Sequence, residues 1–474
     1  MDTRKLRQKI LDLAIRGKLV PQDPNDEPAS VLLERIKAEK EQLIKEGKIK
    51  RPKKTSSSDK SHYENIPFEI PEGWVWCNGN QIFLPMNSIK PSGDMFKYID
   101  IDAIDNKNHK LITPKLIKTK EAPSRASRHT KKGDVLFSMV RPYLENIALI
   151  EENDCIASTG FFICSPSQIL TSEYCYYMML SEYVISGLNQ FMKGDNSPSI
   201  NNIHITSWLY PIPPIKEQNR ISKEIKKWFD FINSIEQEKT ELNTFISQTK
   251  SKILDLAISG KLVPQDPTDE PAINLLKRIN PNFEPCDNSH YENIPFKIPQ
   301  NWCWIKLNTV CNIARGGSPR PIKDYLTTSE DGINWIKIGD TDKDGKYINS
   351  TKEKIIPDGV RKSRMVHKGD FLLTNSMSFG RPYILNVDGC IHDGWLVISP
   401  MKDTYDTEFL YYLLSSRFAY DQFTEIASGG VVSNLNSDKV ANSYFPILSI
   451  SEQKRIADKI TQIWSMIDTI TAEL

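Results

Sequence analysis

The sequence has no apolar run that approaches the roughly 18 residues of a membrane span, and no apolar segment typical of a signal peptide. We therefore expect no membrane partner. Its eight cysteines are scattered, and none forms a Cys-x-x-Cys pair. This argues against a zinc site and fits a cytoplasmic protein with reduced thiols. Neither sign of charge is in excess, because the net charge is only +1, so any nucleic-acid binding must use local patches.

Motifs that carry catalysis are also missing. We find no Gly-x-Gly-x-x-Gly after a strand, no Walker A sequence, no His-Glu-x-x-His and no serine in a nucleophile elbow. The Asn/Asp-Pro-Pro-Tyr motif of amino-methyltransferases is absent too. Nothing pairs a nucleophile with a base, so we predict no catalytic residue and no bound metal or cofactor. Together these absences favour a recognition subunit over an enzyme.

What is present is one long helix, predicted from Glu217 to Ser259. Its apolar residues alternate in steps of three and four, which is the pattern of a coiled-coil seam. The seam is interrupted at Lys239 and Thr249 and consists of Ile221, Ile225, Trp228, Ile232, Ile235, Leu242, Ile246, Ile253 and Leu256. At 1.5 Å per residue the helix would be about 64 Å long. A helix of this length with one apolar stripe needs a partner helix.

Two internal repeats supply that partner. Lys9-Ile-Leu-Asp-Leu-Ala-Ile15 returns 243 residues later at 252–258, and the front of the long helix returns 235 residues later from Glu452. The second copy of the seam consists of Ile456, Ile460, Ile463, Ile467, Ile470 and Leu474. The two chain ends would thus rebuild the long helix. We predict two long antiparallel helices, one continuous and one split, related by a pseudo-two-fold axis.

Two similar globular domains are predicted between these helices. They share the opening Ile-Pro-x-x-Trp-x-Trp (70–76 and 298–304) and later landmarks in the same order: Gly133-Asp134 with Gly369-Asp370, Arg141-Pro-Tyr143 with Arg381-Pro-Tyr383, Gly160 with Gly394, and Tyr176-Tyr177 with Tyr411-Tyr412. Short β-type runs (135–140, 156–164, 371–374, 396–398) with one or two helices predict an α+β fold. The predicted boundaries are 1–60 (helical segment and basic linker), 61–211 (first domain), 212–288 (long helix and spacer), 289–446 (second domain) and 447–474 (C-terminal helix).

A basic cluster falls at the same place in both domains. Lys118, Arg125, Arg128 and Lys132 are matched, 236 residues later, by Lys354, Arg361, Arg364 and Lys368. A solvated loop would explain one such cluster, but repetition in register favours phosphate binding. Two kinds of polar loop carry side chains that could form hydrogen bonds with base edges, although ordinary polar turns would have the same composition. The further candidate DNA-binding residues are Arg141, Asn196, Asn201, Arg315, Arg320, Arg381 and Asn434.

Other features have plainer interpretations. Residues 48–60 are basic and rich in serine, which is typical of a flexible linker, with non-specific phosphate contact as the alternative. The tryptophans at 74, 76, 302 and 304 are predicted to lie in the core rather than to stack on bases.

In this arrangement the chain resembles the specificity subunit of type I restriction–modification systems. The resemblance is carried by the Leu-Ala-x-x-Gly-Lys-Leu-Val-Pro-Gln repeats (13–22 and 256–265), by the domain openings, and by the Pro-x-x-x-x-x-Glu-Gln-x-Arg helix starts (211–220 and 446–455). One departure is the linker 48–60, which has no equivalent before the second domain.

The resemblance implies two α/β target recognition domains, each reading half of a bipartite site in double-stranded DNA. The helices would set the gap between the halves and dock two methyltransferase subunits, and restriction subunits through them. The subunit itself would be non-catalytic. Methylation would use S-adenosylmethionine on its partners, and cleavage would use ATP and Mg²⁺. The alternatives are a coiled-coil scaffold whose two domains bind proteins, and a fused endonuclease–methyltransferase, which the missing motifs oppose.

Overall fold

The computed structural model describes residues 2–46, 66–284, 296–342, 345–375, 380–427 and 435–472. The chain divides into two compact units, Met1–Glu238 (unit 1) and Lys239–Leu474 (unit 2). Helix α7 (Ile215–Ile258) begins in unit 1 and ends in unit 2. The predicted helix 217–259 is therefore confirmed to within two residues at each end.

Unit 1 combines helices with short strands. Its other helices are α1 (Thr3–Ile15), α2 (Ala29–Lys45), α3 (Gly79–Ile82), α4 (Ser172–Met179), α5 (Glu182–Asn189) and α6 (Asn202–Ser207). Its strands are β1 (Val75–Asn78), β2 (Met95–Ile99), β3 (Ile104–Asp105), β4 (Lys110–Leu111), β5 (Lys115–Lys118), β6 (Ala126–Thr130), β7 (Val135–Ser138), β8 (Ile147–Leu149), β9 (Cys155–Ser158), β10 (Phe161–Cys164) and β11 (Leu209–Ile212).

Unit 2 has the same kinds of element. Its helices after α7 are α8 (Ala272–Ile279), α9 (Pro357–Val360), α10 (Thr407–Leu414), α11 (Arg417–Ala427), α12 (Ser437–Ala441) and α13 (Ile450–Ala472). Its strands are β12 (Cys303–Lys306), β13 (Cys311–Arg315), β14 (Leu326–Thr327), β15 (Ile333–Ile336), β16 (Tyr347–Ile348), β17 (Glu353–Ile355), β18 (Arg364–Val366), β19 (Phe371–Thr374), β20 (Pro382–Leu385), β21 (Gly389–Ile391), β22 (Trp395–Pro400) and β23 (Tyr444–Ile447).

Three sheets of unit 1 have counterparts in unit 2, and unit 1 also has a separate two-stranded sheet, β3-β4. Unit 1 has the orders β5-β2-β9-β6, β10-β7-β8 and β1-β11. Unit 2 has β14-β17-β15-β21-β18, β13-β22-β19-β20-β16 and β12-β23, which are the same sheets with extra strands at their edges. In each unit the pair at the centre of one sheet is parallel, β2 with β9 and β15 with β21, and unit 2 has a further parallel pair at a sheet edge, β16 with β20. The α+β prediction is confirmed, but the single run predicted at 156–164 is two strands, because a turn at Thr159-Gly160 separates β9 from β10.

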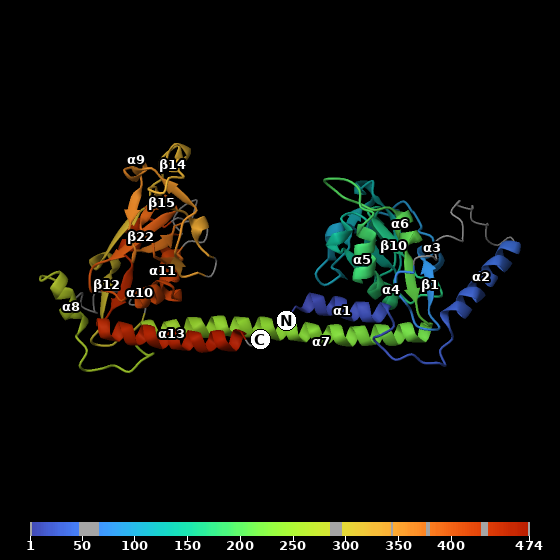
Figure 1. Cartoon of the computed structure of the whole chain (residues 1–474), viewed down its shortest axis with the longest axis horizontal. Coiled ribbons are helices and arrows are strands. Elements are labelled where there is room, and N and C mark those ends of the chain that lie inside the picture. The colour runs from blue at the N-terminus through green and yellow to red at the C-terminus, as the bar shows by residue number, and fades with distance from the viewer. Residues whose placement is uncertain are drawn as a thin grey trace. The chain divides into compact units, whose positions relative to one another are not determined.

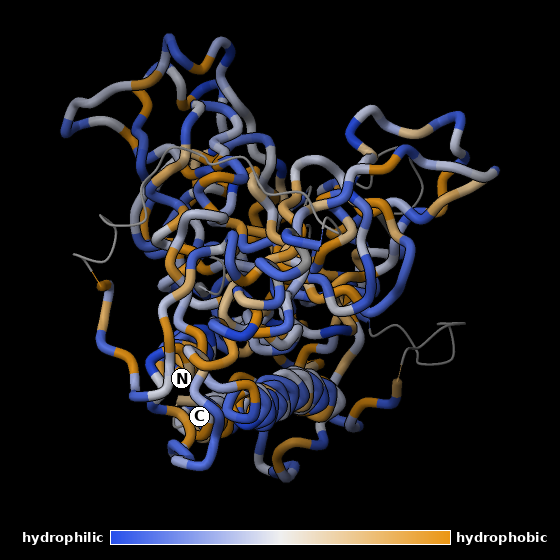
Figure 2. The backbone as a smooth tube through the Cα atoms, turned by 90° about the vertical axis from the view of Figure 1, so that its right-hand side faces the viewer, coloured by the Kyte–Doolittle hydropathy of each residue, from blue (hydrophilic) through white to orange (hydrophobic). Residues whose placement is uncertain are grey.

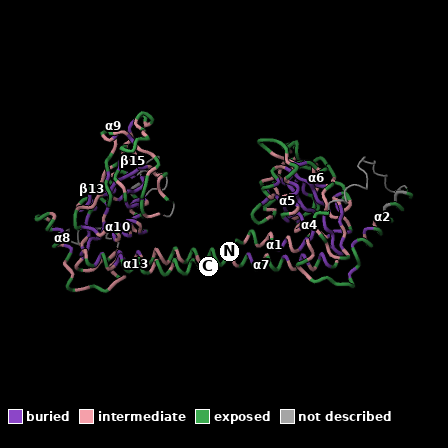
Figure 3. The backbone as a smooth tube through the Cα atoms, viewed as in Figure 1, coloured by how far each residue is buried: buried purple, intermediate pink, exposed green. Residues whose placement is uncertain are grey.

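The buried residues of each unit gather in the interior of its sheets and helices (Figure 3), where the core clusters are apolar, whereas blue, hydrophilic stretches recur in the projecting loops (Figure 2). The four domain-opening tryptophans belong to this interior: Trp74, Trp76, Trp302 and Trp304 are 4–7% exposed. The prediction that they are core residues is confirmed.

Each unit contains an antiparallel pair of long helices (Figure 1). In unit 1 the start of α1 lies near the middle of α7, since Arg7 donates a hydrogen bond to Asn233 (2.9 Å). The end of α1 lies near the start of α7, since Gly17, just beyond α1, contacts Trp74, and Trp74 donates a hydrogen bond to Glu217. In unit 2 the pair is α7 with α13, and Lys250 lies 3.0 Å from Asp468. Each chain end therefore supplies a partner for α7, as the repeats predicted.

The same buried polar contacts attach the helices to both domains. Trp74 Nε1 donates to Glu217 (3.0 Å), and Trp302 Nε1 donates to Glu452 (2.9 Å). Burial raises the pKa of both carboxyl groups, mainly through desolvation. Each tryptophan directly precedes the first strand of its domain, so these contacts join the first turn of α7 and of α13 to the start of a domain.

The predicted seam is confirmed at Ile221, Ile225, Ile232, Ile456 and Ile460, which are fully buried. Ile235, Leu242, Ile246, Ile253, Leu256, Ile463 and Ile467 are half-buried. The prediction is wrong at Ile470, which is 56% exposed, and Leu474 lies outside the described residues.

The prediction for Trp228 is wrong. Its side chain is 40% exposed, and the next residue, Phe229, packs against Tyr177 with ring centroids 5.7 Å apart. Adjacent helical positions are about 100° apart, so at this turn of α7 it is Phe229 and not Trp228 that faces the domain, and the predicted seam resumes at Ile232. In unit 2, Trp464 likewise contacts Tyr412.

Gly260 ends α7 in a backbone conformation that only glycine adopts easily. Its φ is +69°, and a Cβ there would lie 2.3 Å from Cγ of Pro299. We expect Gly260→Ala to lower the free energy of unfolding of unit 2 by more than about 1 kcal/mol, measured by urea denaturation. Gly339→Ala is the matched control, because its Cβ would meet no atom within 4 Å. Equal urea midpoints for the two variants would contradict this account.

Candidate nucleic-acid interface

In unit 1 the predicted basic cluster lies on the outer strands of one sheet. Lys118 ends β5, with a side chain 68% exposed, and Arg125 immediately precedes β6 and is exposed. Arg128 lies within β6 and is half-buried, and its Nε has no hydrogen-bond partner in the described part of the chain. Lys132 is exposed in the turn after β6. The structure therefore gathers these cations around the β2–β9 parallel pair.

The matching residues of unit 2 occupy matching strands. Lys354 lies in β17 and Arg364 in β18, on either side of the β15–β21 parallel pair. Arg361 follows α9 and Lys368 follows β18, and both are exposed. The side chain of Lys354 already makes one hydrogen bond within unit 2, from its Nζ to the carbonyl of Glu330 (2.8 Å). The two clusters therefore lie on corresponding strands of the two units, while DNA binding by them stays a prediction.

Unit 2 brings together two groups that are far apart in the sequence. The loop from Arg315 to Arg320 and the strand β18 both reach the turn His392–Gly394, which joins β21 to β22. The Gly317 N–H donates to the carbonyl of Ile391 (3.2 Å), and Nε of Arg364 lies 3.5 Å from the carbonyl of Arg315. Exposed arginines from two segments, Arg315 and Arg320 of the loop and Arg364 of β18, therefore lie around one turn.

Asp393 is the centre of this turn. Its carboxylate accepts a hydrogen bond from Ser318 Oγ (2.9 Å) and lies 3.3 Å from Nη2 of Arg320. Its carbonyl accepts from Arg315 Nε (3.2 Å) and from Asn375 Nδ2 (2.8 Å). The hydrogen bond from Ser318 is the largest cause that holds the pKa of Asp393 below its usual range, so the carboxylate stays ionised at neutral pH.

Sequence reasoning missed Asp393. The only available signal was its place beside Gly394, one of the landmarks shared by the two domains. In unit 1 the same place is taken by Thr159, whose N–H donates to the carbonyl of Arg125 (2.8 Å). The two units therefore present different chemistry at one structural position.

Arg141 supports a loop. Its N–H donates to the carbonyl of Pro198 (2.8 Å), and its Nη2 donates to the carbonyl of Asn196 (2.7 Å). The Asn196 side chain is exposed on that loop. Asn201 caps α6, since its side chain accepts from the N–H of Ile203 (3.1 Å). Asn434, in the corresponding loop of unit 2, and the linker 48–60 lie outside the described residues.

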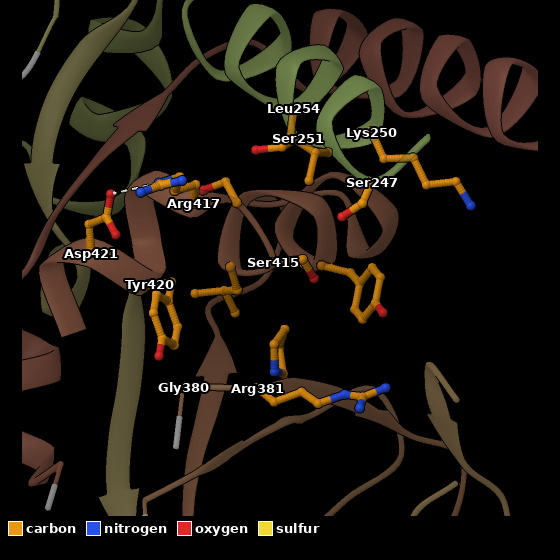
Figure 4. Close-up of a pocket in the computed structure, with 14 residues that line it drawn as sticks. Ser247, Lys250, Ser251, Leu254, Gly380, Arg381, Ser415, Arg417, Tyr420 and Asp421 are labelled. Carbon is orange, nitrogen blue, oxygen red and sulfur yellow. Dashed lines mark hydrogen bonds and ion pairs between the residues drawn. The ribbon is translucent and has the colours of Figure 1, made fainter. Parts of the chain in front are cut away.

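Arg381 lines a cavity of about 860 Å³ between α7 and the ends of α10 and α11, together with Lys250, Ser251 and Tyr420 (Figure 4). The matching cavity in unit 1 is smaller, about 510 Å³. There Gln8, which occupies the position of Ser251, donates to the carbonyl of Leu180 (3.1 Å) and accepts from the N–H of Glu182 (2.9 Å). A serine side chain is too short to make both of these bonds.

The long helices leave large apolar side chains exposed. Trp228, Phe231 and Phe245 on α7 are 40–65% exposed, and Met466 and Ile470 on α13 are 55% and 56% exposed. Between residues 233 and 253 of α7 no side chain is buried (Figure 3). Singly exposed apolar residues are ordinary, but several on one element indicate an unfilled contact surface.

Among the described residues, no group of three His, Cys, Asp or Glu side chains is placed to hold a metal ion, and the seven cysteines are free thiols. Within the same residues, no helix is long and apolar enough to cross a membrane.

Known proteins match this chain along most of its length. Residues 299–474 match the family described as "Type I restriction modification DNA specificity domain". The specificity subunit of the type I restriction enzyme EcoAI from Escherichia coli is 26% identical, over 97% of this chain and 88% of its own length. The corresponding subunit of EcoEI, from the same species, is 28% identical over 79% of this chain and 73% of its own length.

Solved structures agree with the fold. A chain from a structural study of complex assembly and conformational transition of the type I R-M system superimposes with a TM-score of 0.63, at 23% identity, and covers 86% of this chain and 94% of that chain. The HsdS subunit from Thermoanaerobacter tengcongensis superimposes with a TM-score of 0.52, at 22% identity, and covers 86% of this chain and 93% of that chain.

Proposed function

We propose that this chain is the specificity subunit of a type I restriction–modification system, and that its two domains each read one half of a bipartite target in double-stranded DNA. The observation that carries the proposal is the placement of two basic clusters, matched in sequence register, on corresponding strands of the two units. One such cluster would be an ordinary solvated surface. Two in the same structural position are what two DNA-docking domains require.

The mechanism separates affinity from selection. Exposed cations such as Arg125 and Arg361 would contact phosphates, which gives affinity and orientation without sequence information. Side chains at the ends of strands and on loops, including Arg320 and Asn196, would then contact base edges. Since the two units differ at these positions, as they do at Asp393 and Thr159, the two half-sites would differ.

The long helices would have two roles. As a continuous helix, α7 would fix the number of unread base pairs between the half-sites, much as dimer geometry fixes half-site spacing in other DNA-binding proteins. The exposed apolar residues of α7 and α13 would contact two methyltransferase subunits, and restriction subunits would join through these. Methyl transfer from S-adenosylmethionine, and cleavage driven by ATP with Mg²⁺, would be the work of those partners.

Co-purification with the neighbouring methyltransferase subunit, followed by mapping of methylated sites in DNA, tests the proposal. We expect a stable complex that methylates a bipartite motif with a fixed gap. A complex that leaves DNA unmethylated would support assembly but not recognition. Failure to form any complex would favour the protein-binding scaffold.

A further inference from the structure

We propose that Arg320 reads a guanine in the half-site bound by unit 2, and that Asp393 is the residue that positions it. This inference rests on the proposed function, since it assumes that unit 2 docks on DNA. It adds which base is contacted, and it names the side chain that holds the contacting arginine in position.

Arg320 is free to contact a ligand. Its side chain is 82% exposed, and its ion pair with Asp393 uses Nη2. A guanidinium carries five N–H donors in a planar fork, so a pair of parallel donors remains for an acceptor pair outside the protein. The O6 and N7 atoms of guanine in the major groove are such a pair, and arginine is their commonest partner.

Asp393 makes several hydrogen bonds in addition to its ion pair with Arg320. Its position is fixed by Ser318 Oγ on one oxygen, while its carbonyl receives Arg315 and Asn375. An exposed Arg–Asp pair contributes only about 0–1 kcal/mol to stability, so stability gives little reason for this network. Restricting the rotamers of Arg320 before DNA arrives is the better explanation, because it reduces the entropy lost on binding.

The charge of Asp393 favours a base over a phosphate as the ligand. A phosphate approaching Arg320 would also approach an ionised carboxylate that is 42% exposed, and the two anions would repel each other. The edge of a guanine is neutral and meets no such repulsion. Arg361 and Arg364 are exposed and form no ion pair with a carboxylate in the described part of the chain, so they are better placed for phosphates.

The test uses the full complex with its methyltransferase subunits and a DNA duplex that carries the mapped target. For Arg320→Ala we expect discrimination at one guanine of the unit 2 half-site to fall about tenfold to a hundredfold. Its salt dependence should be unchanged. Replacing that guanine by 7-deazaguanine, which lacks the N7 acceptor, should weaken binding by the wild-type complex but add little to the loss in Arg320→Ala. Arg320→Lys should also lose discrimination, because an ammonium cannot make two parallel bonds.

Asp393→Asn tests positioning. It keeps the size of the side chain and an oxygen for Ser318, and it removes the charge that holds Arg320. We expect a smaller loss at the same guanine, an unchanged salt dependence, and no further loss when it is combined with Arg320→Ala. Arg417→Ala is the control, because Arg417 is 75% exposed and also paired to an aspartate, Asp421, at 3.4 Å. Its target motif should stay that of the wild type.

Two outcomes would overturn the inference. If Arg320→Ala weakens binding to all DNA and lowers the salt dependence, Arg320 contacts a phosphate. If the motif and affinity are unchanged, it contacts nothing. Both differ from failure of the proposed function, in which the wild-type complex itself would yield no bipartite motif.

Discussion

Insertion of four residues into the middle of α7 is expected to change the DNA sequence that the complex methylates, while each half-site stays the same. Four residues add about 6 Å to a helix, close to one turn. With about 3.4 Å between base pairs, the gap should shift by one or two base pairs. The insertion belongs between Glu241 and Phe245, within the stretch that contains no buried side chain. Mapping of methylated sites in DNA measures the gap directly.

The control for this insertion keeps the length of the helix. Replacing residues 241–244 by alanines changes the composition of the same turn without changing its rise, and we expect the original gap. An unchanged gap in the insertion variant would show that α7 does not set the spacing.

Charge reversal in the basic clusters should produce the largest loss of affinity. We expect Arg125→Glu and Arg361→Glu each to weaken binding roughly tenfold, on specific and non-specific DNA alike. The slope of log affinity against log salt should fall by about 1 for each phosphate that is no longer neutralised. Titrations of the complex with target and non-target duplexes at several salt concentrations measure both effects.

Lys402→Glu is the matched control for the reversal in unit 2. Lys402 is exposed, but it follows the end of β22 that is far from the His392–Gly394 turn. Its reversal changes net charge equally and should leave binding almost unchanged. Loss of sequence discrimination without loss of non-specific affinity in Arg361→Glu would mean that Arg361 reads a base.

The sequence was a good guide wherever one residue type repeats at a fixed spacing. The 3–4 alternation predicted α7, and the copied segments predicted its pairing with both chain ends, because burial of an apolar stripe dictates such patterns. The pattern failed at Trp228, where the choice between two adjacent large side chains depends on the exact rotation of α7 against Tyr177.

The candidate site was harder to predict. The basic residues were found from their register, but their grouping depends on which strands are neighbours. Arg315 and Arg364 lie far apart in the chain and meet only because β13 pairs with β22 and β18 pairs with β21. Asp393 follows from the same topology. Without the strand order, nothing distinguishes it from other surface aspartates.

The pairing of the first and last strand of each domain has an evolutionary consequence. In unit 1, Val75 of β1 lies opposite Ile212 of β11, and in unit 2, Cys303 of β12 lies opposite Ile447 of β23. The chain therefore enters and leaves each domain through one pair of adjacent strands. This pair lies next to the tryptophan–glutamate contact that attaches the domain to the long helices. A segment bounded in this way can be replaced as one unit, because its two ends lie side by side. On the proposed function, recombination at these two strand pairs would change one half-site in a single step and leave the long helices unaltered.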